Sequence, residues 1–136
     1  IVYIETRRIY TMKDLKVYRC PSCGKMVISL KDSECPTICC GQPMQLLTAN
    51  TTDGAREKHV PVVTREGNTV SVNVGSVDHP MIPEHYIEWI ALQTEKGFRI
   101  VYLEPGQAPK ADFLADEQVK AVYAYCNLHG LWKTEA

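Results

Sequence analysis

The sequence predicts an all-β protein in which a small cysteine-rich metal module precedes a larger antiparallel β-sandwich or barrel. Two observations support this fold class. Short segments rich in β-branched and aromatic residues, separated by turn residues, fill the chain after residue 58. Five of the six cysteines lie between residues 20 and 40, whereas all four histidines follow residue 58. The chain is therefore expected to contain two units, each with its own group of metal-binding side chains.

The polar stretch at residues 48–58 is the expected boundary between the two units, because Thr, Asn, Asp and Gly accumulate there between apolar segments. The first unit is accordingly expected at residues 15–48 and the second at residues 49–136. Residues 1–14 are interpreted as an N-terminal extension whose origin the sequence does not identify.

Strands of the second unit are expected where β-branched and aromatic residues recur, at residues 60–64, 69–74, 86–94, 98–103 and 119–126. Turns at Glu66-Gly67-Asn68 and Glu95-Lys96-Gly97 would close two hairpins, and residues 104–112, which contain Pro and Gly, are expected to form a loop. The period of residues 83–94 also fits a helix, but their Ile, Trp and Tyr content favours a strand.

Composition excludes several classes of protein. The 136 residues suffice for one ordinary core and a small accessory module. A formal net charge of -1, with no Lys/Arg block longer than a pair, argues against a nucleic-acid partner. No apolar run approaches the roughly 18 residues that span a bilayer, and the first residues lack the order of a signal peptide. We therefore expect a cytoplasmic protein with no membrane partner.

Four cysteines of the first unit have the spacing of a metal site. Thiols stay reduced in the cytoplasm, which favours metal binding over disulfides. Cys20 and Cys23, separated by two residues, can hold one ion, and Cys39 and Cys40 would complete a tetrahedral set of four sulfurs. Adjacent strand residues point to opposite faces, so the chain must bend sharply there, which Gly41 permits. Four sulfurs suit iron or zinc.

Cys35 has no evident role in this set. It could replace one of the adjacent cysteines as a ligand, but we interpret it as a free, partly buried thiol.

The four histidines lie among turn or charged residues rather than on an apolar stripe. His79 and His85 are separated by a segment with two prolines, which excludes a regular helix and favours a loop that can surround a metal. Cys126 and His129 lie three residues apart before a glycine, so one tight turn can present both. Together with His59 they form a nitrogen-rich set with one sulfur, which suits a redox transition metal such as iron.

The cysteine module resembles desulforedoxin, a small iron domain with paired adjacent cysteines. The similarity rests on CPSCG at residues 20–24 and CCGQPM at residues 39–44, and it covers about residues 16–47. It implies that Cys20, Cys23, Cys39 and Cys40 hold an iron, with a structural zinc site as the alternative.

The second unit resembles the catalytic domain of the superoxide reductases, the family of neelaredoxin and desulfoferrodoxin. The motifs EKHVP, HPMIPEHYIEWI and YCNLHGLWK carry the similarity, which covers about residues 50–133. The resemblance implies an immunoglobulin-like antiparallel β-sandwich. It also implies a ferrous ion with an open sixth position, an axial Cys126 thiolate and four equatorial imidazoles, those of His59, His79, His85 and His129.

The same resemblance implies the reaction. Superoxide would bind at the open position and be reduced by one electron to hydrogen peroxide without release of dioxygen, and an external donor, expected to be a rubredoxin-like protein, would then re-reduce the iron. Lys58 would attract the anion with help from Arg56, and Glu57 would act as an exchangeable sixth ligand of the oxidised iron. A homodimer is expected by the same analogy.

Two further expectations concern the surroundings of the iron. The backbone amides of Leu128 and His129 lie close enough in sequence to donate to the Cys126 sulfur. Trp89 and Trp132 are interpreted as packing residues rather than electron relays.

The alternative function is a rubredoxin-like electron carrier, or a metal-binding scaffold without superoxide chemistry. An iron dioxygenase is disfavoured because those enzymes usually bind iron with two histidines and a carboxylate rather than a thiolate. A superoxide dismutase would be distinguished by the dioxygen that it releases.

Overall fold

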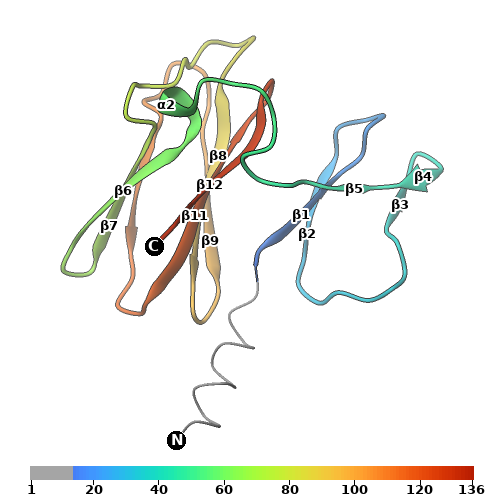
Figure 1. Cartoon of the computed structure of the whole chain (residues 1–136), viewed down its shortest axis with the longest axis horizontal. Helices are drawn as coiled ribbons and strands as arrows, with labels where there is room; N and C mark the ends of the chain where they lie inside the picture. Colours follow the sequence, from blue (N-terminus) through green and yellow to red (C-terminus); the bar gives the residue numbers. More distant parts are fainter. Residues whose placement is uncertain (1–13) are drawn as a thin grey trace, which may run out of the picture. The chain divides into compact units, whose positions relative to one another are not determined.

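A computed structural model of the chain describes residues 14–136 (Figure 1). Apart from Asp14, the predicted extension at residues 1–14 lies outside the described residues. The described chain is almost entirely β-structure, with a single helical turn, α2 (Arg56–His59), and the predicted all-β class is confirmed. No helix in residues 14–136 has the length and hydropathy needed to cross a membrane. The boundary between two compact units falls between Thr48 and Ala49.

The first unit consists of very short strands. They are β1 (Lys16–Arg19), β2 (Met26–Ser29), β3 (Ile38–Cys39), β4 (Gln42–Pro43) and β5 (Gln45–Leu46). β2, β1 and β5 form one antiparallel sheet, and β3 pairs with β4 in a second. Within the described part of this unit, only Val17, Cys20 and Met44 are buried.

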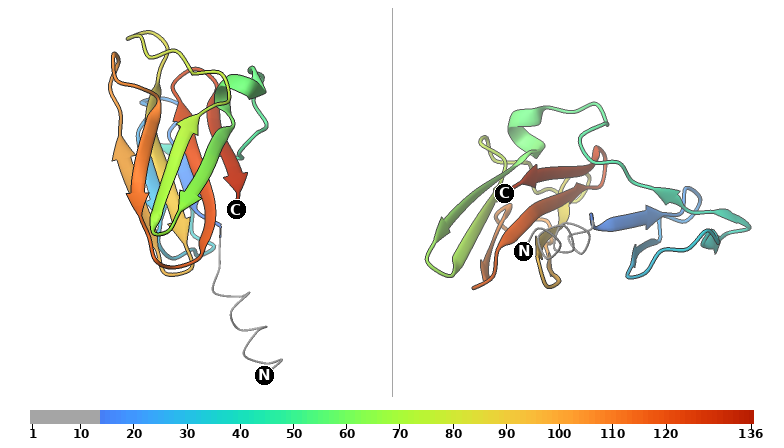
Figure 2. Two further views of the ribbon diagram at one scale, coloured as in Figure 1. Left: turned by 90° about the vertical axis from the view of Figure 1, so that its left-hand side faces the viewer. Right: turned by 60° about the horizontal axis from the view of Figure 1, so that its bottom comes forward.

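The second unit is a sandwich of two antiparallel sheets. One contains β6 (Pro61–Glu66), β7 (Thr69–Val74) and β10 (Lys110–Leu114) in the order β10-β7-β6. The other contains β8 (Ile87–Thr94), β9 (Phe98–Tyr102), β11 (Val119–Cys126) and β12 (Gly130–Glu135) in the order β12-β11-β8-β9. Figure 2 shows the sheets as two layers. One hydrophobic cluster lies between the two sheets, since it contains Val72 of β7 and Phe113 of β10 from one sheet and Leu92 of β8 from the other.

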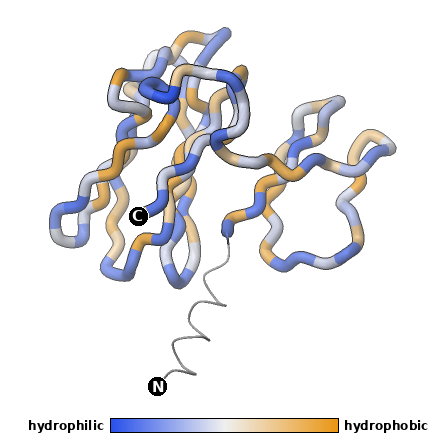
Figure 3. The backbone as a smooth tube through the Cα atoms, viewed as in Figure 1, coloured by the Kyte–Doolittle hydropathy of each residue, from blue (hydrophilic) through white to orange (hydrophobic). Residues whose placement is uncertain are grey.

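Alternation of side chains explains the strands. In β7, Val70, Val72 and Val74 are buried, whereas the residues between them are partly exposed. Hydrophilic residues collect at the hairpin turns (Figure 3), and the β6–β7 turn places Gly67 at a φ of 58°, a conformation that glycine adopts readily. The predicted strand at residues 86–94 is confirmed by β8, and the helical alternative is excluded.

Two strands of the sandwich were not predicted. β10 begins inside the segment expected to be a loop, and β12 follows the last expected strand. In β10 the one large buried side chain is Phe113, with exposed Lys110, Asp112 and Leu114 around it. A strand at the edge of a sheet buries little, so its sequence pattern is weak.

The core of the sandwich gives a first testable prediction. Ile90→Ala should lower the free energy of unfolding by about 2–5 kcal/mol, because Ile90 is fully buried in β8 and the substitution leaves a cavity. Urea unfolding followed by tryptophan fluorescence measures the change. Leu114→Ala is the control, since Leu114 is 69% exposed and its loss should change stability by no more than about 0.5 kcal/mol.

Candidate metal centres

Five donor side chains from separate segments converge at one end of the sandwich. Their ligand atoms all lie within 4.8 Å of one another, and they belong to His59, His79, His85, Cys126 and His129. His59 is the last residue of α2, the next two histidines lie in the loop between β7 and β8, Cys126 ends β11, and His129 lies in the turn before β12. The structure therefore brings together the whole predicted set.

Hydrogen bonds outside the cluster fix which ring nitrogens face inward. His59 Nδ1 donates to the Ala55 carbonyl and His79 Nδ1 donates to the Pro80 carbonyl, both at 2.7 Å. The two Nε2 atoms then face each other at 3.1 Å, and His59 Nε2 lies 3.1 Å from His129 Nδ1. The Nδ1–H groups of His59 and His79 donate to these carbonyls, so both Nε2 atoms are unprotonated and direct lone pairs at each other. A bound cation stabilises such an arrangement.

His85 supplies the clearest sign of a missing partner. Its Nε2 is buried and has no hydrogen-bond partner among the described residues. Buried polar atoms are nearly always paired, so an unpaired nitrogen aimed into a group of donors fits a metal ligand.

The protonation of the cluster also favours a metal. Burial lowers the pKa of His79 to about 4, and burial likewise lowers the pKa values of His59 and His85. The rings are therefore neutral near pH 7, which is the form that binds metal ions.

The Cys126 sulfur is held by backbone amides. Burial raises the pKa of the Cys126 thiol, and the amides of Leu128 and His129 oppose that rise. The His129 amide donates to Cys126 Sγ at 3.4 Å. A cation beside the sulfur would favour the thiolate, as metal ions do for coordinating thiols. These donors, four imidazoles and one thiolate, fit a redox transition metal such as iron.

Trp132 packs directly against the five-donor cluster, a contact that the spacing of residues in the sequence does not reveal. Its ring stacks on His59 with centroids 4.8 Å apart, and its Nε1 donates to the His129 carbonyl at 3.0 Å. Gly54 makes this packing possible, since a Cβ there would lie 3.2 Å from Trp132 Cζ2 and 3.3 Å from His59 Cε1. The sequence shows Gly54 only as part of a polar boundary.

Glu57 and Lys58 are exposed residues of α2, directly before buried His59. The structure does not place the Glu57 carboxylate among the five converging donors. The positive charge of Lys58 is near enough to contribute, after burial and His129, to the lowered pKa of His85.

The loop after β7 holds the backbone of α2 in place. The Glu57 carbonyl accepts hydrogen bonds from the Val77 amide at 2.9 Å and from Ser76 Oγ at 3.3 Å. Gly75 approaches so closely that a Cβ on it would lie 2.6 Å from the Glu57 carbonyl oxygen. This contact was also missed, because nothing in the sequence relates residues 75–77 to α2.

Four sulfurs form a second group in the first unit. The Sγ atoms of Cys20, Cys23, Cys39 and Cys40 lie within 4.8 Å of one another, with Cys23 and Cys39 at 3.6 Å. The expected bend is present, with φ of 53° at Cys40 and 75° at Gly41. A non-glycine residue rarely adopts a positive φ, so Cys40 itself takes part of the strain that lets adjacent cysteines face one point.

The acidity of these thiols favours a cation between them. The Cys23 amide donates to Cys20 Sγ at 3.5 Å, and this bond lowers the pKa of Cys20 to about 6. The hydrogen bond to Cys20 raises the pKa of Cys39 to about 12. Without a cation, Cys20 therefore ionises readily whereas Cys39 stays protonated. A metal ion among the sulfurs would stabilise the thiolate form of all four cysteines.

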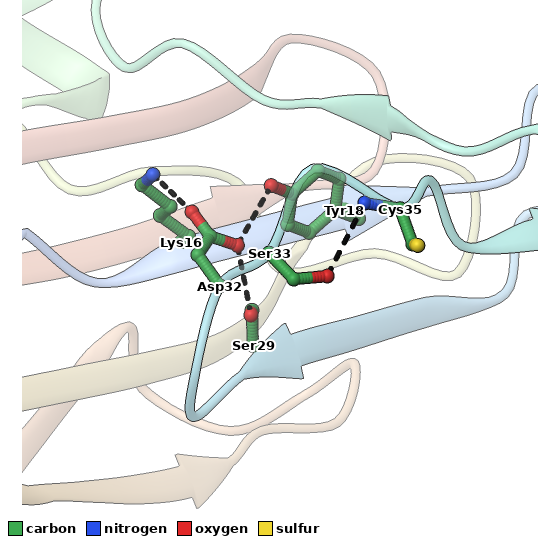
Figure 4. A network of polar contacts seen from close by, with 6 residues as sticks. All are labelled: Lys16, Tyr18, Ser29, Asp32, Ser33 and Cys35. Carbon is green, nitrogen blue, oxygen red and sulfur yellow. Dashed lines mark hydrogen bonds and ion pairs between the residues drawn. The ribbon is translucent and has the colours of Figure 1, made fainter.

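Cys35 lies outside both groups, and its predicted partial burial is wrong. It is a free, exposed cysteine whose amide donates to Ser33 Oγ at 3.2 Å. The loop that carries it is fixed by Asp32, which accepts hydrogen bonds from Ser29 Oγ at 3.0 Å and from Tyr18 at 3.3 Å and pairs with Lys16 (Figure 4). The hydrogen bond from Lys16 holds the pKa of Asp32 below its usual value.

Comparison with known proteins identifies relatives of both units. The sequence model of desulfoferrodoxin matches residues 51–135, and that of the desulfoferrodoxin N-terminal domain matches residues 12–47. A desulfoferrodoxin homologue of Archaeoglobus fulgidus is 47% identical, and the alignment covers 88% of this chain and 96% of the relative. A desulfoferrodoxin of Nitratidesulfovibrio vulgaris is 45% identical, with 89% and 96% covered.

A solved structure agrees with this relationship. The crystal structure of the superoxide reductase from Treponema pallidum matches with a TM-score of 0.76 and 37% identity, over 90% of this chain and 100% of the other. A protein of Thermococcus kodakarensis named superoxide reductase is 39% identical, with 65% of this chain and 93% of the relative covered.

The separation of the two groups gives a second prediction. Cys39→Ser should remove about one metal ion per chain, because a tetrahedral site that loses one of four thiolates binds its metal poorly. Cys35→Ser, the matched control, should retain both ions since Cys35 lies outside the groups. Elemental analysis of the purified chains measures this, and loss of metal from the control would contradict the assignment.

The close approach of Gly75 gives a third prediction. Gly75→Ala should lower the free energy of unfolding by about 1–3 kcal/mol and weaken metal retention, because the added methyl group displaces α2 and His59 with it. Urea unfolding and elemental analysis provide the two measurements. Gly97→Ala is the matched control, since no atom lies within 4 Å of its added Cβ, and an equal effect there would refute the interpretation.

Proposed function

The chain belongs to the desulfoferrodoxin family, and on that premise we propose that it is a superoxide reductase that binds iron at the cluster of His59, His79, His85, Cys126 and His129. The convergence of these ligand atoms within 4.8 Å is the observation that carries the proposal. Iron bound there supplies one electron to superoxide, and two protons from water complete hydrogen peroxide. If the ion takes six ligands, these five protein donors would leave one position for the substrate.

Within this proposal, Cys126 is the donor that tunes the metal. Its sulfur is fully buried, so a thiolate there is shielded from water. The amides of Leu128 and His129 withdraw part of its negative charge through their hydrogen bonds. The balance of burial and amide donation sets how strongly the thiolate pushes electron density toward the metal.

Lys58 and Glu57 are proposed to control access to the centre. Superoxide is an anion, and an exposed ammonium beside the cluster raises its rate of encounter. Arg56 adds a second cation on the same helical turn. The hydrogen bonds from Ser76 and Val77 fix the backbone from which the side chain of Glu57, the proposed exchangeable ligand, extends.

The four-sulfur group is proposed to hold a second iron, with zinc as the alternative. An external donor, proposed to be a rubredoxin-like protein, returns the electron used in each turnover, and the chain is proposed to act as a homodimer. The competing function is an electron carrier in which the four-sulfur iron alone exchanges electrons and the second centre does not react.

Rapid mixing of the reduced, iron-loaded chain with superoxide tests the activity. The reductase should oxidise one centre per superoxide consumed, form an equal amount of hydrogen peroxide and release no dioxygen. An inert second centre would establish the electron carrier instead. Catalytic release of dioxygen would show a dismutase.

The fourth prediction concerns Lys58. Lys58→Ala should lower the bimolecular rate constant with superoxide by about tenfold and weaken its dependence on salt, because the attracting charge is lost. Pulse radiolysis over a range of ionic strengths measures both, and the iron absorption spectrum should not change. Lys110→Ala, an exposed lysine of β10, is the control. Equal rates in both variants would refute a steering role for Lys58.

A further inference from the structure

Asn127 follows Cys126, but its side-chain hydrogen bonds go to another segment of the chain. Its amide reaches across to the loop that carries His85. Oδ1 accepts a hydrogen bond from the Tyr86 amide at 3.0 Å, and Nδ2 donates to the Glu84 carbonyl at 3.1 Å. The Asn127 backbone amide adds a third bond, to the Tyr86 carbonyl at 3.2 Å. Residue 127 is thus bonded to the chain on both sides of His85.

The tip of the His85 loop has little packing of its own. Met81 at its start packs against the core, but Ile82, Pro83 and Glu84 are exposed. The hydrogen bonds between Ile82 and His85, at 3.1 and 3.0 Å, run in both directions within the turn, so they shape the tip without joining it to another segment.

The ring of His85 also lacks the support that other histidines have. His59 and His79 each donate their outer nitrogen to a backbone carbonyl at 2.7 Å. No such bond to His85 Nδ1 is found among residues 14–136, and its Nε2 is the unpaired buried atom of the cluster. The orientation of His85 therefore depends on its backbone, which Asn127 holds from both sides.

We propose that Asn127 is a positioning residue that holds His85 in its metal-binding orientation and couples it to the turn of Cys126. The inference rests on the proposed function only in taking the five-donor cluster as a metal centre. It concerns the retention of metal rather than superoxide chemistry, so its test is independent of activity.

The chain offers a matched control in Asn50. The Asn50 side chain makes the same pair of bonds, since Nδ2 donates to the Lys133 carbonyl at 3.1 Å and Oδ1 accepts from the Lys133 amide at 2.9 Å. Neither residue is a proposed ligand. Asn50 also has a φ of 62°, which asparagine tolerates better than alanine, so Asn50→Ala is a demanding control for general loss of stability.

The experiment compares Asn127→Ala with Asn50→Ala in the full-length, iron-loaded chain. Metal retained at the five-donor centre is measured against a competing chelator. Asn127→Ala should weaken retention by about 10-fold to 100-fold, the usual effect of removing a partner that orients a ligand. Asn50→Ala should leave it within about twofold, and the electron paramagnetic resonance signal of the oxidised centre should shift only in the first variant. Equal retention in the two variants would overturn the proposal.

A double-mutant cycle with His85→Ala decides the route of the effect. If Asn127 acts through His85, Asn127→Ala should cause no further loss of metal once His85 is removed. Additive losses would show that Asn127 merely stabilises the turn, and would overturn the proposal. Should Asn127→Ala fail to fold, Asn127→Asp serves instead. It keeps the acceptor for the Tyr86 amide and loses the donor to Glu84, so it should retain metal at an intermediate level, and wild-type retention would contradict the proposal.

Discussion

Five ligand atoms lie within 4.8 Å of one another in the second unit, those of His59, His79, His85, Cys126 and His129. Their lone pairs repel one another, so the rest of this unit must hold them together. Without a cation, the site holds an unpaired nitrogen and a buried thiol. Such groups cost stability, which the packing of the sandwich must offset. A metal ion reverses the sign of each interaction, so the same crowding becomes the source of tight binding.

The two sheets make this crowding possible because they fix the points from which the loops start. Cys126 is the last residue of β11, and the register with β8 shifts between Tyr125 and Cys126, a bulge that can redirect a side chain at the end of a strand. On the same strands but outside the core cluster, the buried side chains of Trp89 and Tyr125 stack with ring centroids 5.7 Å apart. The strands thus fix where Cys126 lies, and side-chain hydrogen bonds such as those of Asn127 support the loop that carries His85.

The sequence predicted the donors well for a physical reason. Histidine and cysteine are scarce in this chain, and each belongs to a short motif, so the candidate set was small. The fold class and most strands followed from alternating side chains in the same way. The edge strand β10 was missed because it buries a single large side chain, Phe113.

Other features depend on contacts between distant segments, and no local pattern reports them. The approach of Gly75 to the Glu57 carbonyl joins the loop after β7 to α2, two segments that only the folded sandwich brings together. The same holds for Gly54 beneath Trp132. Local spacing identifies which atoms can bind a metal, whereas the residues that orient those atoms become visible only in three dimensions.

The small core of the first unit has a consequence for how the two units respond to a shortage of metal. With only Val17, Cys20 and Met44 buried among its described residues, this unit has little apolar burial to stabilise it, and metal binding by its four cysteines would supply much of its stability. The sandwich has a large apolar core of its own. When metal is scarce, the second unit should therefore stay folded on its apolar core, whereas the first should unfold more readily.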